Sequence, residues 1–163
     1  MKYLLDTNIY IEACRSEEQR VHFRTTYFPL LPATFLSAVV AYELYVGAQD
    51  RHTQNLVREF IGPMERTGRV VSPTFADWTE AATIVSTIAE QERNWRSKIP
   101  VLINDILIAL CARRIGATLF TYNREDFRLI RRHKEFLFED TRSSGIGFPL
   151  TLDSCFAHFF SHF

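Results

Sequence analysis

Short apolar runs alternate along the chain with longer segments in which apolar residues recur at helical spacing. The runs that predict strands cover residues 2–5, 34–36, 69–71, 118–121 and 136–138. Helical periodicity is found over residues 9–14, 38–48, 76–88 and 103–115. Strands that alternate with helices are typical of α/β proteins, so we predict a three-layer α/β/α fold with a parallel sheet of about five strands.

Glycine and proline residues mark where these elements end. Gly47 and Gly116 are placed to terminate the helices that precede them. Pro29 and Pro32 indicate a loop before the second strand. The polar composition of residues 49–59 predicts an exposed helix.

The length of 163 residues and the hydrophobic content of 47% suit one well-buried core and are too small for two ordinary domains. We expect a single domain over residues 1–140 and a C-terminal extension over residues 141–163. In the extension, phenylalanines recur at helical spacing at positions 156, 159, 160 and 163. This apolar stripe either packs on the domain itself, which is the commoner outcome, or forms a surface for another chain.

The charged side chains balance, with 19 basic and 19 acidic residues and a formal net charge of zero. No overall positive field attracts nucleic acid, so any such binding has to come from a local patch. Three cysteines are scattered without a CxxC pair, which is typical of free thiols in a reducing cytosol. We find no signal-like start and no apolar stretch of membrane-spanning length, and we expect a cytoplasmic protein without membrane contact.

An acidic residue, Asp6, directly follows the first strand in the stretch LLDTNIYIE. Ligands of open α/β sheets bind outside the carboxyl ends of the strands, so Asp6 is well placed for chemistry. Asp, Thr and Asn are also common helix caps, so capping of the next helix explains the same pattern. The sequence leaves both interpretations open.

Glu43 lies on an apolar face of its predicted helix, where its neighbours at helical spacing are Val39, Val40, Val46 and Gly47. A buried carboxylate costs several kcal/mol unless it is paired or takes up a proton. Glu43 therefore needs a cation, a network of hydrogen-bond donors or a metal ion.

Asp105 and Asp126 complete the set of acids. Asp105 begins a helix that is apolar almost all round, where Asn104 and Asp105 can also serve as cap and first-turn acid. Asp126 follows the fourth strand, where an exposed turn acid is equally compatible with the sequence. In a parallel sheet these two acids can converge with Asp6 and Glu43 on one edge, in an oxygen-rich pocket suited to Mg²⁺ or Mn²⁺. Clustered carboxylates repel one another unless divalent ions neutralise them.

Several stretches of the chain resemble the PIN-domain ribonucleases, and within them the VapC-like toxins of bacterial toxin-antitoxin pairs. They are LLDTNIYIE, LSAVVAYELYVGA and the block NDILIALCARRIGATLFTYNREDF. The block carries an ND element and an NxxDF element, separated by an apolar helix, a glycine turn and a strand. Together they form a fairly specific pattern that spans residues 1–127.

The resemblance implies metal-dependent cleavage of RNA phosphodiester bonds, with Mg²⁺ or Mn²⁺ as the cofactor. It identifies four catalytic acids, Asp6, Glu43, Asp105 and Asp126. All of these except Glu43 are implied to be metal ligands. The polar positions beside the acids are Asn8, Thr121 and Asn123. No protein nucleophile is required, because metal ions activate water and stabilise the departing oxygen.

The resemblance also implies a homodimer and a VapB-like antitoxin whose peptide lies over the pocket, with DNA contacted only through the antitoxin. Two basic segments are candidates for RNA binding. Their residues are Arg93, Arg96 and Lys98 in the first segment, and Arg124, Arg131 and Arg132 in the second. Arginine can bind phosphates bidentately. A solvated charged surface explains both segments equally well.

Two other functions are compatible with parts of the pattern. A phosphatase of the haloacid dehalogenase type needs a second Asp two residues after the first, and this chain has Asn8 there. A non-catalytic α/β module that binds RNA or a protein partner explains the acids as caps and the phenylalanine-rich extension as a docking surface. Stabilisation by Mn²⁺ distinguishes a metal enzyme from a protein-interaction module.

Overall fold

The computed structural model of the chain describes residues 1–91 and 99–141. Its centre is a five-stranded parallel sheet with the strand order β3-β2-β1-β4-β5. The strands are β1 (Lys2–Leu5), β2 (Thr34–Ser37), β3 (Val70–Val71), β4 (Ala117–Thr121) and β5 (Phe138–Asp140). The predicted α/β fold with a parallel sheet is confirmed.

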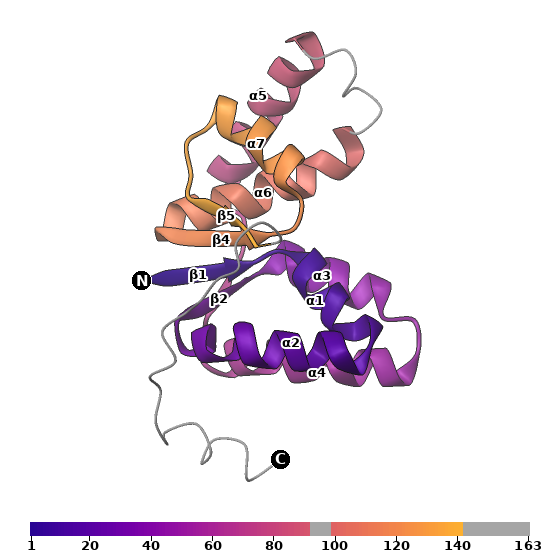
Figure 1. Ribbon diagram of the computed structural model, residues 1–163. Coiled ribbons are helices and arrows are strands. Elements are labelled where there is room, and N and C mark those ends of the chain that lie inside the picture. The colour runs from indigo at the N-terminus through magenta and orange to yellow at the C-terminus, as the bar shows by residue number, and fades with distance from the viewer. Residues whose placement is uncertain (92–98, 142–163) are drawn as a thin grey trace.

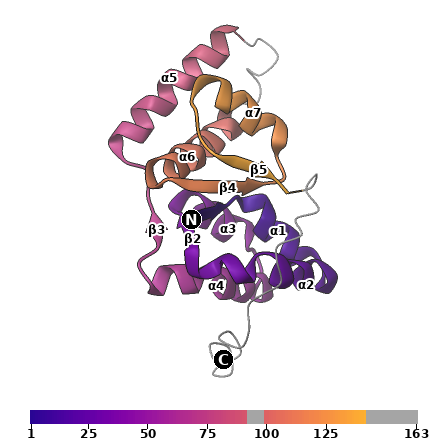
Figure 2. The ribbon, with the colours of Figure 1, turned by 60° about the vertical axis from the view of Figure 1, so that its left-hand side comes forward.

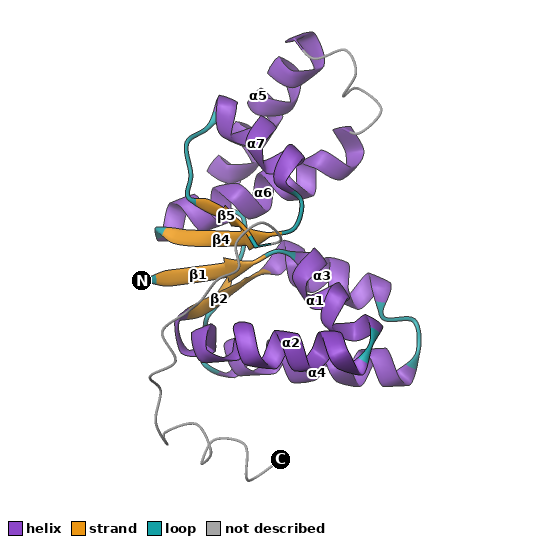
Figure 3. Cartoon of the chain, in the orientation of Figure 1, coloured by secondary structure: helices purple, strands orange, loops and turns teal. Residues whose placement is uncertain are grey.

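Helices cover both faces of this sheet. They are α1 (Thr7–Arg15), α2 (Glu17–Thr26), α3 (Ala38–Gly47), α4 (Arg51–Arg66), α5 (Phe75–Gln91), α6 (Ile99–Ile115) and α7 (Arg124–His133), with a 3₁₀ helix η1 (Phe28–Ala33). Helices α1 to α4 lie on one side of the sheet and α5 to α7 on the other (Figure 1, Figure 2). The view coloured by secondary structure separates the three layers (Figure 3).

Helix α2 was not predicted, because its sequence EEQRVHFRTT is polar and carries a single buried residue, Phe23. The ring of Phe23 lies 4.9 Å from that of Phe60 and 5.7 Å from that of Tyr10, measured between centroids. Ser16 caps the helix, since its hydroxyl accepts a hydrogen bond from the backbone N–H of Gln19. One aromatic anchor and a cap therefore hold a helix that lacks apolar periodicity.

The prediction of an exposed helix over residues 49–59 was wrong in two respects. Helix α4 continues to Arg66, and one face of it is buried in the core. The buried apolar side chains on this face are Leu56, Val57, Phe60, Ile61 and Met64. The amphipathic period of α4 becomes clear only over its full length, because the first turn is entirely polar.

The pairing of β1 with β4 determines which residues meet at the carboxyl edge. Leu5 is the register partner of Phe120, and the backbone N–H of Asp6 continues the ladder with a hydrogen bond to the Phe120 carbonyl at 2.9 Å. The next residues, Asp6 and Thr121, therefore lie side by side. Both are buried, because β1 and β4 are interior strands covered on both faces.

Helix α6 begins at Ile99, several residues before the predicted start, and Gly116 with a φ of 66° follows its last residue. Asn104 and Asp105 consequently lie inside the helix, beyond its first turn. The alternative that they are the cap and the first-turn acid of this helix is wrong.

Some sequence-based predictions lie outside the described residues. These concern Arg93, Arg96 and Lys98, and the extension with its phenylalanine stripe from residue 142 onwards. The last strand was predicted two residues early, since Phe136 packs in the core ahead of β5. Within residues 1–91 and 99–141, no helix combines the length and apolar character needed to cross a membrane.

A candidate metal centre at the carboxyl edge of the sheet

Asp6 is both a helix cap and an acid at the edge of the sheet. Its Oδ1 accepts a hydrogen bond from the backbone N–H of Thr7 at 2.8 Å, which caps the start of α1. Its Oδ2 accepts from Asn8 Nδ2 at 2.6 Å and from Thr121 Oγ1 at 2.7 Å. The capping interpretation is confirmed for Oδ1, while Oδ2 lies among polar side chains at the edge of the sheet, where a role in chemistry stays a prediction.

Glu43 is half-buried on α3, and a network of neutral donors surrounds it. Its Oε1 accepts a hydrogen bond from Asn104 Nδ2 at 2.7 Å, and its Oε2 accepts a short one from Thr7 Oγ1. Of the three kinds of partner that the sequence leaves open for this acid, the described residues supply a network of hydrogen-bond donors.

Asp105 and Asp126 share one donor. The side-chain amide of Asn123 donates to Asp105 Oδ2 at 3.2 Å and to Asp126 Oδ2 at 2.6 Å. Asp105 is buried on α6, while Asp126 lies in the first turn of α7. The backbone of Asn123 is held in place by a hydrogen bond, because its N–H donates to Thr121 Oγ1 at 2.8 Å. The turn after β4 therefore links these two acids to the Asp6 side of the site.

The acids of this group act on one another electrostatically. Burial, and after it the negative charges of Asp6, Asp126 and Glu43, raise the pKa of Asp105 to about 8, against the opposing effect of the hydrogen bond from Asn123. Burial also raises the pKa of Asp6 to about 6, although the hydrogen bonds from Thr121 and Thr7 oppose this shift. Both raised values indicate a site that favours a proton or another cation.

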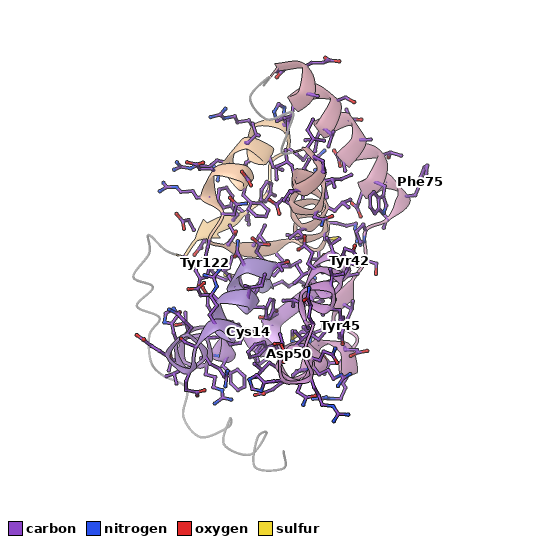
Figure 4. The ribbon with its side chains drawn as sticks, turned by 90° about the vertical axis from the view of Figure 1, so that its right-hand side faces the viewer. Cys14, Tyr42, Tyr45, Asp50, Phe75 and Tyr122 are labelled. Atoms are coloured by element: carbon purple, nitrogen blue, oxygen red, sulfur yellow. The ribbon has the colours of Figure 1, made fainter. Side chains whose placement is uncertain are left out.

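An open pocket of about 500 Å³ exposes this group to solvent. Its polar lining consists of Asp6, Thr7, Asn8, Glu43, Asn104, Asp105 and Asn123. Asp126 is not among the lining residues and reaches the group through Asn123. The rim is apolar and includes Ile11, Tyr42, Val46 and Val101. Figure 4 views the molecule from this edge, with Tyr42 on α3 and Tyr122 after β4.

The donor set of the pocket suits a hard divalent cation, because it offers carboxylate, amide and hydroxyl oxygens without histidine or cysteine. In the described part of the chain, no three Asp, Glu, His or Cys side chains are close enough to form a ready-made metal site. Amide donors lie between the carboxylates, as Asn123 does between Asp105 and Asp126. Binding of a cation would therefore require the side chains to exchange these hydrogen bonds for metal contacts.

The structure brings together every acid and every polar neighbour that the sequence singled out for this site. Thr7 and Asn104 were not predicted to belong to the site, yet their side chains donate hydrogen bonds to Glu43. Both directly neighbour a predicted acid in the sequence, which was the available signal. Their polarity was assigned to helix capping instead.

The arginines of α7 lie elsewhere. Arg124, Arg131 and Arg132 are exposed together with Arg128, and they line a separate concavity next to β5. Asp126 lies two residues from both Arg124 and Arg128, which at about 3.6 residues per turn places it across the helix from them. Arg124 Nε is 3.7 Å from Asp140 Oδ2, and the Arg131 guanidinium lies 5.4 Å from the Phe138 ring centroid. The acid pocket has no arginine among its lining residues in the described part of the chain.

Comparisons with known proteins agree with this architecture. The sequence matches the PIN domain family over residues 3–132. The structure is similar to VapBC-1 from nontypeable Haemophilus influenzae, with 26% identity and a TM-score of 0.57, over 86% of this chain and 98% of that one. It is also similar to VapBC2 from Rickettsia felis bound to a promoter DNA fragment, with 19% identity and a TM-score of 0.58, over 85% and 98% of the two chains. A further similar structure is FitAcB from Neisseria gonorrhoeae, with 19% identity and a TM-score of 0.58, over 87% and 99%. A search of curated protein sequences gave no significant match.

Proposed function

The chain belongs to the PIN domain family, and on this premise we propose that it is a divalent-metal-dependent endoribonuclease, the toxin of a toxin-antitoxin pair. The observation that carries the proposal is the group of buried and half-buried acids at the carboxyl edge of the sheet. Burial and mutual repulsion raise the pKa of Asp105 to about 8, so the ionised site gains stability from a bound cation.

The proposed metal ligands are Asp6, Asp105 and Asp126, and the proposed ion is Mg²⁺ or Mn²⁺. A bound divalent cation supplies Lewis-acid activation of water and stabilises negative charge at a phosphodiester. Asn8, Thr121 and Asn123 hold the ligand carboxylates through hydrogen bonds of 2.6 to 3.2 Å. Such orienting partners commonly matter almost as much for metal affinity as the ligands themselves.

Glu43 is assigned a different task from the other acids. Both of its oxygens accept hydrogen bonds from uncharged groups, so the donors that the structure describes orient its negative charge without neutralising it. In this position Glu43 can accept a proton from the water that attacks the phosphorus. The departing oxygen then takes up a proton from solvent, and no covalent intermediate with the protein is needed.

The proposed partners are an RNA substrate, a VapB-like antitoxin and a second copy of the chain. The antitoxin is proposed because VapBC proteins are among the similar structures, one of them bound to a promoter DNA fragment. Any DNA contact of this chain would accordingly pass through the antitoxin. RNA contacts are proposed for the exposed arginines Arg124, Arg131 and Arg132 of α7.

The decisive test is cleavage of a mixed pool of structured RNAs by the isolated chain with Mn²⁺ or Mg²⁺. The control is Asp105→Asn, prepared in parallel by the same procedure. We expect metal-dependent products from the wild type alone. Equal activity in both preparations would identify a contaminating nuclease. If neither preparation cut, a non-catalytic module that binds RNA or a protein partner would be the better description.

A further inference from the structure

Glu43 differs from the other acids of the site in how its side chain is held. The ligand acids follow strands or lie in helices next to the sheet edge, whereas Glu43 projects from α3 on a long side chain with several rotatable bonds. Its two oxygens nevertheless have separate protein donors, Thr7 Oγ1 on one and Asn104 Nδ2 on the other. A flexible acid is thereby restricted to one orientation at the pocket.

The two donors come from opposite layers of the fold. Thr7 is the first residue of α1, which lies on the same side of the sheet as α3, and Asn104 belongs to α6 on the other side (Figure 1). They are separated from Glu43 by 36 and 61 positions in the sequence. Glu43 therefore bridges the two helical layers where they meet at the pocket.

The chemistry of the donors is as informative as their positions. A lysine or arginine in place of Thr7 or Asn104 would form an ion pair with Glu43. The ion pair would make the Glu43 carboxylate a weaker acceptor for the proton of the attacking water. A hydroxyl and a primary amide orient the carboxylate and leave its negative charge in place. Both donors also line the pocket beside the acids, so their contacts are made at the site itself.

We propose that Thr7 and Asn104 are positioning residues that together fix the carboxylate of Glu43 in its orientation for catalysis. The inference rests on the proposed nuclease function. Neither side chain is assigned a contact with metal or RNA, and both act through Glu43. Loss of either donor leaves the acid in place but frees its rotation, so the chemical step is slowed while binding of RNA and metal is retained.

The test uses near-isosteric variants that remove one donor each, Thr7→Val and Asn104→Leu. We expect kcat for RNA cleavage to fall by about 10–100-fold, the usual effect of losing an orienting partner, with KM little changed. Thr7→Ser, which keeps the hydroxyl, should restore most of the rate. The matched controls are Thr53→Val, which removes another threonine-to-carboxylate bond outside the lining of the pocket, and Asn55→Leu at an exposed position of the same helix.

A second readout does not depend on activity. In urea unfolding without metal, Asn104→Leu should cost less stability in a Glu43→Ala background than in the wild type, because its partner is already gone. Mn²⁺ should still raise the Tm of Thr7→Val and Asn104→Leu, because the ligand acids are intact.

Full activity of both variants alongside an active wild type would overturn the inference alone, as would strict additivity in the unfolding experiment. An inactive wild type would overturn the nuclease proposal and the inference with it.

Discussion

The hydroxyl of Thr121 donates a hydrogen bond of 2.7 Å to the carboxylate of Asp6, a residue 115 positions earlier in the chain. Both side chains are buried. The contact exists because β1 and β4 are neighbours in the sheet and end at the same level. The same hydroxyl also accepts hydrogen bonds from Asn8 Nδ2 at 3.1 Å and from the Asn123 N–H at 2.8 Å. Thr121 therefore connects the polar residues that follow β1 with those that follow β4.

Removal of this hydroxyl is expected to destabilise the protein. Thr121→Val leaves a buried carboxylate short of one donor, which costs about 1–3 kcal/mol in free energy of unfolding. The pKa of Asp6 should rise further, because the Thr121 bond opposes the effect of burial. Urea unfolding at neutral pH measures the loss. Thr121→Ser is the control, and a Val variant as stable as the Ser variant would contradict the prediction.

The pKa shifts predict how the stability of the metal-free protein depends on pH. Burial and the neighbouring carboxylates together raise the pKa of Asp105 from 3.8 to about 8, so the folded state holds its proton more tightly than the unfolded state does. The resulting stabilisation is complete below about pH 4 and is lost as the pH rises towards 8. Asp6, with a pKa of about 6, adds to the decline between pH 4 and 6.

Asp105→Asn should therefore flatten the fall in stability between pH 4 and 8 in the presence of EDTA. Asp50→Asn serves as the control, because hydrogen bonds from Thr53 lower the pKa of this exposed cap. The ionised carboxylate of Asp50 stabilises the folded state at pH values above its pKa in the unfolded chain. This contribution disappears as the pH falls through its lower pKa in the folded state. A decline in Asp105→Asn as steep as in the wild type would contradict the expected role of Asp105.

A divalent ion should raise the melting temperature. A ligand bound only to the folded state adds about 2.7 kcal/mol at a hundredfold excess over Kd, or about 5–10 °C in Tm for a chain of this size. We expect this gain with Mn²⁺ for the wild type and for Asp50→Asn. Differential scanning fluorimetry should show no gain for Asp105→Asn, and an equal gain in that variant would place the ion elsewhere.

The exposed arginines of α7 are expected to contribute to RNA binding. Charge reversal at Arg131 and Arg132 should weaken binding and lower the slope of log affinity against log salt by about one for each lost phosphate contact. Binding is measured in EDTA so that no cleavage occurs. Arg51→Glu, at an exposed position of α4 on the other side of the sheet, is the matched control. Unchanged affinity and salt slope in the α7 variants would exclude these residues as RNA contacts.

Much of the fold and the site was predictable because the relevant signals are local. The apolar runs gave the strands, and the polar residues that follow them marked the carboxyl edge. Asp6, Glu43 and Asp105 stood out by contrast with apolar neighbours, and Asp126 by its position after the fourth strand. Their convergence followed from one further assumption, a parallel sheet, whose strand ends meet on one side.

Other features depended on contacts between distant segments. Helix α2 could not be read from periodicity, because one buried residue, Phe23, holds it against the core. Helix α6 begins at Ile99, so Asn104 lies inside the helix and does not cap it. The side chain of Asn104 donates to Glu43 instead. Likewise, the direction of α7 decided that its arginines lie away from the acid pocket.

The sequence by itself determined which residues are apolar, which are acidic, and at which ends of the elements the acids lie. Only the tertiary structure decided that Thr121 bonds to Asp6, that Asn123 joins Asp105 to Asp126, and which donors hold Glu43. The physical reason is that hydrophobic periodicity encodes which face of an element is buried but not which element covers it. Partners of buried polar groups are fixed by strand order and helix packing, and these exist only in the folded chain.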